Sequence, residues 1–242
     1  MIIDMFTYYN ETELLDFHIN HVSKYVDKII VVEGDRTYDG RPYASTVQFS
    51  NPKVEHHIVP LNPNPSSRWE NEAIQRRLAG EIAKRYTGSL YFECADEIIH
   101  PAHYLDRTEP VCLSLDNYYY YFNGRDVGEK PDHPMPIAIP IDQITDLHQQ
   151  WEHRHGFRTI NKSGWHFSYL GGVERIKQKL AAYSHAENDV PEIKDSLEYN
   201  IAKGKDIFYR PDHRFEYVPI DDTFPKELID NQDKYKELIH EA

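Results

Sequence analysis

Residues 28–33 read Lys28-Ile-Ile-Val-Val-Glu33, an unbroken run of β-branched side chains between two charged residues. Such a run is typical of a parallel strand that is buried on both faces of a sheet. Similar strand-like segments cover residues 2–8, 54–59 and 89–93. Apolar residues at helical spacing predict two helices, over residues 11–25 with Asn10 as the cap, and over residues 68–86.

Polar side chains gather where these strands end. Asn10 and Glu11 follow the first strand, Glu33 closes the second, and Asp96 and Glu97 follow the fourth. The alternation of strands and helices predicts an α/β fold, with a mainly parallel sheet flanked by helices on both faces. Because ligands bind such sheets outside the carboxyl ends of the strands, these residues converge on one expected site.

The second half of the chain has a less regular pattern. A strand is expected over residues 111–122, and residues 225–242 have the pattern of a charged amphipathic helix. No linker is long enough to divide the chain, so we expect a single domain over residues 1–242.

Another group of candidates surrounds a pair of glycines at residues 171–172. Alternation around Trp165 predicts a strand that places His166 and Ser168 on one face. The glycines then open a helix whose first turn contains Glu174. The positive end of the helix dipole favours the carboxylate form that a general base requires, although an ordinary helix-start glutamate has the same pattern.

Composition excludes several classes of protein. The chain has 242 residues, and 27 Lys and Arg against 40 Asp and Glu give a net charge of −13. General nucleic-acid or anionic-membrane binders need a basic face, so these partners are excluded. No apolar run approaches the roughly 18 residues of a membrane span, and no signal peptide pattern is present. Two cysteines make no disulfide framework, so we expect a reducing, cytoplasmic location.

Two features of the first half of the chain could bind charged ligands. Asp96 and Glu97 at a strand end match the oxygen ligands that Mg²⁺ or Mn²⁺ prefers. A solvated acidic turn without a metal has the same sequence pattern and is the alternative. Arg76 lies on the small-residue stripe of its helix, where a guanidinium needs a phosphate or a buried carboxylate. Glu72 is one turn earlier, so a structural Arg76–Glu72 pair is the alternative.

Several common catalytic motifs are missing from the sequence. There is no phosphate-binding loop of the Gly-x-x-x-x-Gly-Lys type, no Gly-x-Ser-x-Gly and no Gly-x-Gly-x-x-Gly. The 14 histidines and two cysteines show no zinc-ligand spacing. ATPase, serine hydrolase and dinucleotide-binding functions therefore have no local support.

Five segments in order give the chain a family resemblance. They cover residues 6–11 with 14–15, 26–33 continuing to 40–42, 69–72 with 75–76, 96–98, and 164–168 continuing to 184–187. In these segments, which span about residues 2–205, the chain resembles glycosyltransferase family 17. The resemblance implies a GT-A fold, which is a Rossmann-like mixed sheet flanked by helices in a single domain.

The resemblance also implies an activity and a division of labour along the chain. The implied reaction is an inverting transfer of a sugar, with GlcNAc as the candidate, from a UDP-sugar to a glycan hydroxyl, assisted by Mn²⁺ or Mg²⁺. Residues 1–100 would bind the nucleotide-sugar, and residues 101–220 would hold the acceptor and the catalytic groups. Residues 221–242 would form a C-terminal helix.

Roles for single residues follow from the same resemblance. The residues that would bind the nucleotide-sugar are Asn10, Glu11, Glu33, Arg76, Asp96 and Trp165. By analogy with GT-A enzymes, Glu174 is the candidate base, Asp96 and His185 are the candidate metal ligands, and His166 could serve in either role.

One departure from the family pattern bears on the metal. Cys94 stands where the first Asp of the family's Asp-x-Asp motif is expected, which leaves the choice between Mg²⁺ and Mn²⁺ open. A non-catalytic nucleotide-sugar or glycan binding module with a degenerate metal site is the main alternative function. A metal-dependent hydrolase that uses Asp96 and histidines is a third hypothesis.

Overall fold

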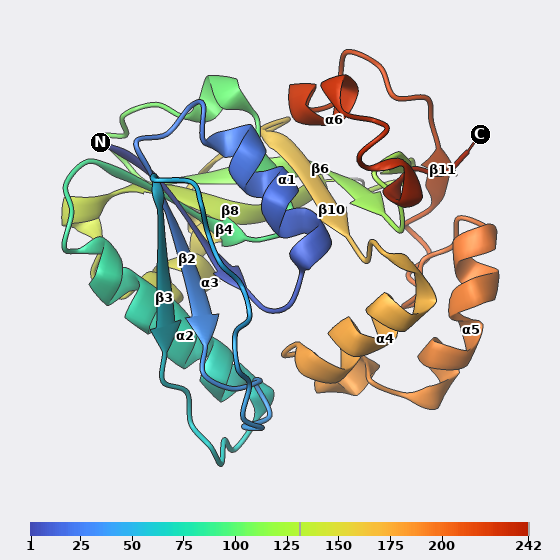
Figure 1. Cartoon of the computed structure of the whole chain (residues 1–242), viewed down its shortest axis with the longest axis horizontal. Helices are drawn as coiled ribbons and strands as arrows, with labels where there is room; N and C mark the ends of the chain where they lie inside the picture. The colour runs from blue at the N-terminus through green and yellow to red at the C-terminus, as the bar shows by residue number, and fades with distance from the viewer. Residues whose placement is uncertain (131, 242) are drawn as a thin grey trace.

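The first half of the chain consists of strands with two helices between them, and the second half mixes mostly shorter strands with more helices (Figure 1). A computed structural model describes residues 1–130 and 132–241. The strands are β1 (Ile2–Tyr8), β2 (Lys28–Gly34), β3 (Val54–Val59), β4 (Ser89–Cys94), β5 (Glu97–Ile99), β6 (Val111–Tyr119), β7 (Gly124–Asp126), β8 (Asp132–Pro140), β9 (Arg158–Ile160), β10 (Gly164–Ser168) and β11 (Phe215–Tyr217). The α-helices are α1 (Thr12–Val22), α2 (Arg68–Ala83), α3 (Leu147–Glu152), α4 (Gly172–Ala182), α5 (Pro191–Ala202) and α6 (Lys226–Asp230). Within the described residues, no helix has the length and apolar character needed to span a membrane.

All the strands join one mixed sheet, so the prediction of a single α/β domain is confirmed. The main path of the sheet runs in the order β11-β7-β6-β8-β4-β1-β2-β3. Strands β4, β1, β2 and β3 are parallel neighbours, as the alternating pattern predicted, whereas β8 is antiparallel to both β4 and β6. The parallel strands all end at the same edge of the sheet, where their polar ends meet.

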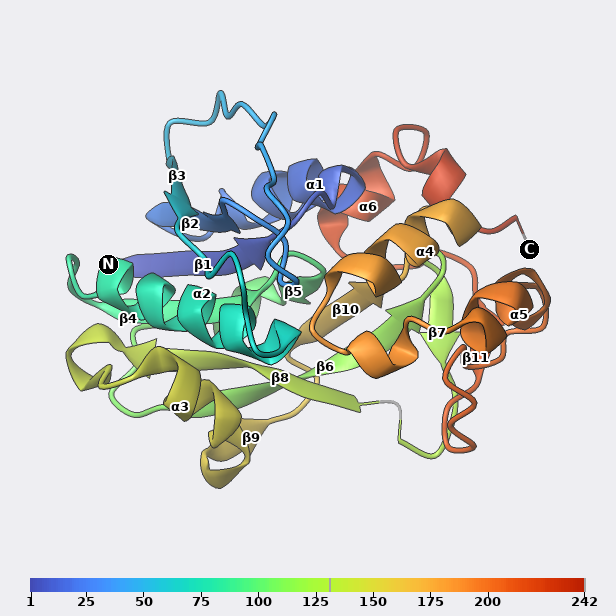
Figure 2. The ribbon, with the colours of Figure 1, turned by 90° about the horizontal axis from the view of Figure 1, so that it is seen from below.

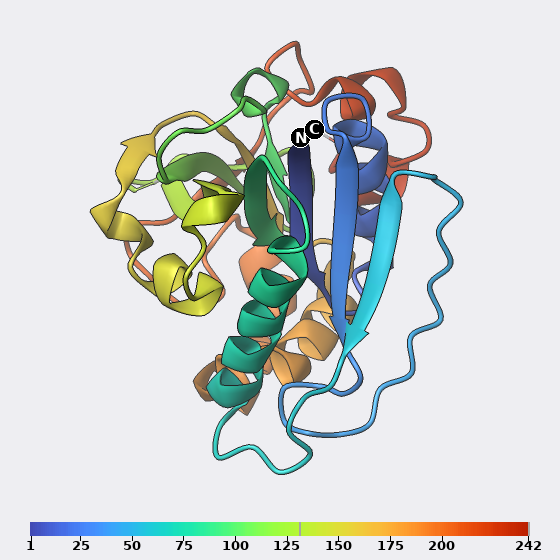
Figure 3. The same ribbon diagram turned by 90° about the vertical axis from the view of Figure 1, so that its left-hand side faces the viewer.

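Strand β2 shows why this region needs helices on both faces. Successive side chains of a strand point to opposite faces. Ile29 therefore shares an apolar cluster with Ile19 of α1, whereas Ile30 shares another with Ile82 of α2. All of β2 from Ile29 to Gly34 is buried, with α1 and α2 on opposite faces of the strands (Figure 3).

Strand β10 places two polar side chains on one face, as the alternation predicted. It pairs in parallel with β6 and antiparallel with β5. Trp165 and Phe167 point into an apolar cluster with Tyr118, while His166 and Ser168 line a cleft on the opposite face. The chain then turns at Gly171, which has a φ of 88°, into α4, which lies beside the beginning of α2 (Figure 2).

The prediction that Asn10 caps the first helix is wrong. The cap position is Glu11, whose side chain makes no capping hydrogen bond, and the helix begins at Thr12. Asn10 instead has a φ of 53°, a left-handed conformation that asparagine tolerates better than most residues. This conformation makes the sharp turn from β1 into α1 at the edge of the cleft.

The expected C-terminal helix over residues 221–242 is also wrong in its extent. Helix α6 covers only five residues, and a 3₁₀ turn follows at Lys236–Leu238. Between them the chain turns so that Tyr235 is buried, with its ring 5.3 Å from that of Phe17. Burial of this aromatic side chain outweighs the helical pattern of the sequence. Ala242 lies outside the described residues.

Candidate functional site

A cleft of about 1020 Å³ opens at the carboxyl ends of the parallel strands. Its lining includes Asn10 and Glu11 after β1, Gly34 at the end of β2, and Asp96 after β4. Helices α2 and α4 form its walls, and they contact each other where Arg68 Nη1 donates to the Leu180 carbonyl at 3.2 Å. The cleft thus lies where an α/β sheet binds its ligands.

An ion-pair network lies in this cleft, centred on Lys179 of α4. Its Nζ is 2.5 Å from Oδ2 of Asp96 and 2.9 Å from Oε1 of Glu11. Ser168 Oγ donates to the same Asp96 oxygen at 3.0 Å. The network joins residues from three separate parts of the chain at one point.

The charges of this network are fixed by its geometry. Burial alone would raise the pKa of Asp96, but Lys179 and His166 hold it well below its usual value. Burial alone would lower the pKa of Lys179, but Asp96 and Glu11 raise it above its usual value. Asp96 is therefore an anion and Lys179 a cation at neutral pH.

His166 lies beside this network, and one of its ring nitrogens is hydrogen-bonded to another side chain. Its Nδ1 is 2.9 Å from Oδ1 of Asn117, whose amide nitrogen donates to Oδ2 of Asp126 at 3.2 Å. Because the Asp126 carboxylate accepts hydrogen bonds, this bond directs the Asn117 oxygen toward His166, and Nδ1 must carry the proton. The neutral ring therefore has its lone pair on Nε2, which is 3.6 Å from Oδ2 of Asp96.

A second histidine stacks on His166. The rings of His133 and His166 are 3.7 Å apart and nearly parallel, and His133 Nε2 is 3.0 Å from Oε1 of Glu97. Burial, with the neighbouring His166, lowers the pKa of His133 to about 4. His133 is therefore neutral at pH 7 and donates its Nε2 proton to Glu97.

Arg76 faces the cleft and also forms the ion pair that the sequence offered as its alternative role. Its guanidinium is 2.7 Å from Oε1 of Glu72 and 3.4 Å from Oε1 of Glu152. It also lies 3.4 Å from the centre of the Trp151 ring, a cation–π contact. These contacts fix the plane of the guanidinium at the cleft wall.

The surroundings of Asp96 do not fit a divalent cation as they stand. Lys179 already neutralises the Asp96 carboxylate, and burial raises the pKa of the neighbouring Cys94 thiol, which is therefore neutral. The Glu97 carboxylate is held by His133 and by the Cys94 backbone N–H, which is 2.6 Å from Oε2. The predicted partner His185 instead pairs with Glu187 at 2.7 Å. The metal at Asp96 and His185 stays a prediction.

Three other predicted residues lie away from the cleft surface. None of them is among the described residues that line the cleft. Glu33 is fully buried at the end of β2, with Oε2 2.7 Å from His56 Nε2. Trp165 donates from Nε1 to the Thr223 carbonyl at 3.1 Å on the opposite face of β10. The Glu174 side chain is 81% exposed and pairs with Lys177 at 2.8 Å.

Basic side chains gather along the cleft of this acidic protein. Its described lining contains seven basic side chains, namely Arg36, Arg41, Arg76, Arg154, Arg175, Lys179 and Arg210. It contains five acidic ones, namely Glu11, Glu72, Asp96, Glu97 and Glu152. Three of these cations, Arg36, Arg41 and Arg210, also pair with Asp35, Asp39 and Asp206 beside the cleft. A chain of net charge −13 therefore gathers cationic groups along this cleft, each held by carboxylates, and such groups can bind an anionic ligand.

Lys179 lies within the last segment of the family resemblance, but sequence reasoning gave it no role in the site, although a signal was present. Helix α4 buries Ile176 and Leu180, and Lys179 lies between these positions at helical spacing. A lysine beside an apolar stripe needs a carboxylate partner, and this one has two. The sequence feature that indicates this role is a lysine beside the buried face of the helix that follows the glycine pair.

A group of three buried side chains was also missed. Among the described residues, Asp4, His18 and Glu93 are the group of three that could hold a metal ion. The signals were an aspartate inside the apolar segment 2–8 and a histidine on the apolar face of the helix that follows it.

The chain was compared with known proteins by family and by sequence. The family model described as Glycosyltransferase family 17 matches residues 1–240, which is nearly the whole chain. A search of curated proteins gave no match.

Proposed function

The chain belongs to glycosyltransferase family 17, and from this premise we propose that it transfers a sugar from a UDP-sugar to a glycan hydroxyl with inversion. GlcNAc is the candidate sugar. The proposal extends to the site residues below and to a GT-A arrangement of the sheet, with the donor at the carboxyl ends of β1, β2 and β4.

The observation that carries this proposal is that cationic side chains line opposite walls of the cleft in an acidic protein. A nucleotide-sugar diphosphate is an anion, and the net charge of −13 opposes its approach unless local cations outweigh the global field. Lys179 and Arg76 face the cleft from α4 and α2 respectively. Cations on both walls suit a diphosphate held between the helices.

The donor is expected to lie across the strand ends. Asn10 and Glu11 would border the nucleoside at the end of β1, and Arg76 would face the diphosphate. Lys179 would stabilise the negative charge that develops on the leaving UDP, because it is a cation held in place before the reaction begins. This role requires no movement of Asp96, which keeps Lys179 charged and oriented.

His166 is our assignment for the general base. In an inverting transfer, the acceptor oxygen attacks the anomeric carbon on the face opposite the leaving diphosphate and loses its proton to the base. The lone pair on His166 Nε2 is available for that proton, and Asp96 at 3.6 Å would stabilise the imidazolium that results. Glu174, the other candidate, is exposed and paired with Lys177.

A ligand panel followed by an activity assay tests the function. UDP-GlcNAc and other UDP-sugars should raise the Tm of the protein, because a ligand that binds the folded state stabilises it by mass action. Release of UDP in the presence of a library of glycan acceptors would support transfer. A rise in Tm without any UDP release would support the non-catalytic binding module instead. A protein that responds to no nucleotide-sugar would overturn both.

A further inference from the structure

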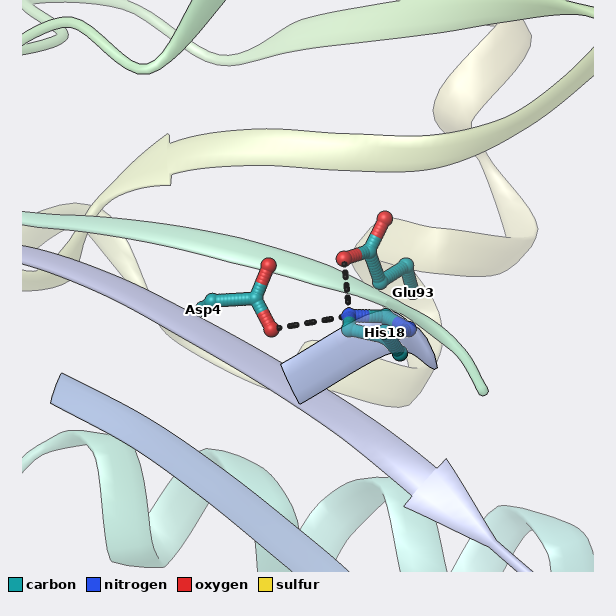
Figure 4. Close-up of side chains that lie close together, drawn as sticks. All are labelled: Asp4, His18 and Glu93. Carbon is teal, nitrogen blue, oxygen red and sulfur yellow. Dashed lines mark hydrogen bonds and ion pairs between the residues drawn. The ribbon is translucent and has the colours of Figure 1, made fainter. Parts of the chain in front are cut away.

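Three side chains meet where α1 packs against the sheet (Figure 4). Asp4 comes from β1, His18 from α1 and Glu93 from β4, and all three side chains are fully buried. His18 Nε2 lies 3.2 Å from Oδ1 of Asp4 and 3.2 Å from Oε1 of Glu93. None of the three is among the described residues that line the cleft, so the group is separate from the proposed donor site.

The His18 ring is oriented so that Nε2 can act as a ligand atom. Its Nδ1 lies 3.0 Å from the carbonyl oxygen of Ala95. A carbonyl only accepts hydrogen bonds, so Nδ1 carries the proton and the lone pair of the neutral ring is on Nε2. A backbone carbonyl that holds the second nitrogen is the usual outer-shell partner of a metal-binding histidine.

The two carboxylates lack the partners that buried anions need. Neither oxygen of Glu93 has a hydrogen-bond partner. Oδ1 of Asp4 and Oε1 of Glu93 both face the same histidine nitrogen at 3.2 Å. Asp4 has one outer partner, the Tyr104 hydroxyl, which donates to Oδ2 at 2.7 Å. With a neutral histidine and both carboxyl groups ionised, the group would carry two negative charges away from water, which is unfavourable unless a cation balances them.

We propose that Asp4, His18 and Glu93 bind one Zn²⁺ ion, and that this ion fastens α1 to β1 and β4. A divalent cation would balance the two carboxylates. Bonds of about 2.1 Å in a tetrahedral zinc site hold ligand atoms roughly 3.4 Å apart, and the two distances from Nε2 are both 3.2 Å. Both oxygens of Glu93 are without hydrogen-bond partners, so this side chain can supply two ligand atoms.

The same features argue against the other common divalent ions. Mg²⁺ keeps several water molecules and Ca²⁺ takes six to eight oxygen ligands, whereas this group is fully buried and includes a nitrogen. An imidazole with two carboxylates suits zinc. Because the site joins the first helix to two central strands, its role is structural and it takes no part in the transfer.

The test measures the metal directly. The tag-free protein is purified without added metal, and its metals are measured by mass spectrometry. It is then unfolded with a chelator and refolded with Zn²⁺ or with Co²⁺. We expect about one zinc per chain, a higher Tm after refolding with zinc than without, and the visible absorption of tetrahedral cobalt. Wild-type protein that takes up no zinc on refolding would show that protons, shared by His18 and Glu93, balance the charge, and the proposal would fail.

Variants locate the site. Glu93→Gln should lose the zinc while His21→Gln retains it, since His21 is also buried on α1 but bonds only to the Ile99 carbonyl at 3.2 Å. Equal zinc in both variants would place the metal elsewhere and overturn the assignment. If Glu93→Gln does not fold, the visible spectrum of the cobalt-refolded wild type still tests the proposal. Cobalt bound by one nitrogen and carboxylates absorbs differently from hydrated cobalt, so a spectrum of hydrated cobalt would overturn the assignment.

Discussion

Lys179 Nζ lies 2.5 Å from Oδ2 of Asp96, so the carboxylate that was predicted to bind a metal is neutralised by a lysine of the chain itself. The two residues are 83 positions apart in the sequence. Strand β4 delivers Asp96 to the sheet edge, and α4 carries Lys179 across the cleft to meet it. The proposed donor site therefore contains a lysine that carboxylates of the chain hold in place before any ligand arrives.

Replacing this lysine should weaken donor binding and destabilise the fold. Lys179→Met leaves Asp96 and Glu11 buried without their cation, a change that costs about 3 kcal/mol. The two uncompensated carboxylates would also repel the diphosphate, so the Kd of a UDP-sugar should rise by roughly 100-fold. Isothermal titration with a UDP-sugar measures the affinity, and thermal unfolding measures the stability.

A lysine on the same helix provides the matched control. Lys177 pairs with the exposed Glu174 and does not line the described cleft, so Lys177→Met should bind the donor as the wild type does. If Lys179→Met bound the UDP-sugar with unchanged Kd while remaining folded, Lys179 would have no part in the donor site.

Chelation should leave donor binding intact. Because Lys179 supplies the charge at Asp96, the Kd of a UDP-sugar should be the same after brief EDTA treatment as in the presence of Mn²⁺. A zinc ion at the buried Asp4 group would survive this treatment, since it exchanges only when the protein opens. Donor binding that appears only with Mn²⁺ would instead mean that Lys179 leaves Asp96 and that a metal takes its place.

The parallel core could be predicted from the sequence because burial on both faces leaves an unbroken apolar run. Strands β1 and β3 begin and end at the predicted residues, and β2 and β4 extend one residue further. The convergence of Asn10, Glu11 and Asp96 on one cleft followed from the same argument. The local sequence pattern was enough to predict this convergence, because parallel strands end at a common edge of the sheet.

The failures share a cause, which is contact between distant segments. Nothing near Lys179 in the sequence shows that Glu11, 168 residues away, and Asp96 would be its partners. Glu174 has the right place in its helix for a base, but its direction depends on how α4 packs, and it points to solvent. The C-terminal segment has a helical pattern, yet packing of Tyr235 on Phe17 breaks it.

Removal of the proposed base should reduce turnover and spare donor binding. His166→Ala removes the Nε2 lone pair beside Asp96, so kcat should fall about 100- to 10,000-fold, with little change in the Kd of the UDP-sugar. Glu174→Gln should leave kcat unchanged, because this side chain is 81% exposed. The reverse result, with loss of activity in Glu174→Gln alone, would restore Glu174 as the base.

Arg76 should be sensitive to a change that keeps its charge. Arg76→Lys retains one positive charge but loses the stacking of the guanidinium on the Trp151 ring. It also cannot form both ion pairs, with Glu72 and with Glu152, in the geometry of the guanidinium. The Kd for the UDP-sugar should rise by about tenfold, while uridine, which lacks the diphosphate, should bind equally to both proteins. Equal loss for uridine would show that Arg76 only shapes the cleft.

Stability should fall with pH below neutrality because of His133. Burial, with His166 nearby, lowers the pKa of His133 to about 4 in the folded protein, against about 6.5 in an unfolded chain. Between these values the unfolded state holds more protons, so the stability is complete above pH 6.5 and is lost as the pH falls toward 4. The contribution of this one group is at most about 3 kcal/mol.

The pH dependence of the free energy of unfolding checks this assignment. His133→Gln should flatten the decline between pH 6.5 and 4 without removing it, because burial also lowers the pKa of His21 to about 4. His155→Gln, at an exposed position, should keep the wild-type slope. A slope unchanged in His133→Gln would show that His133 is protonated in the folded cleft, and that the pair with Glu97 is an ion pair.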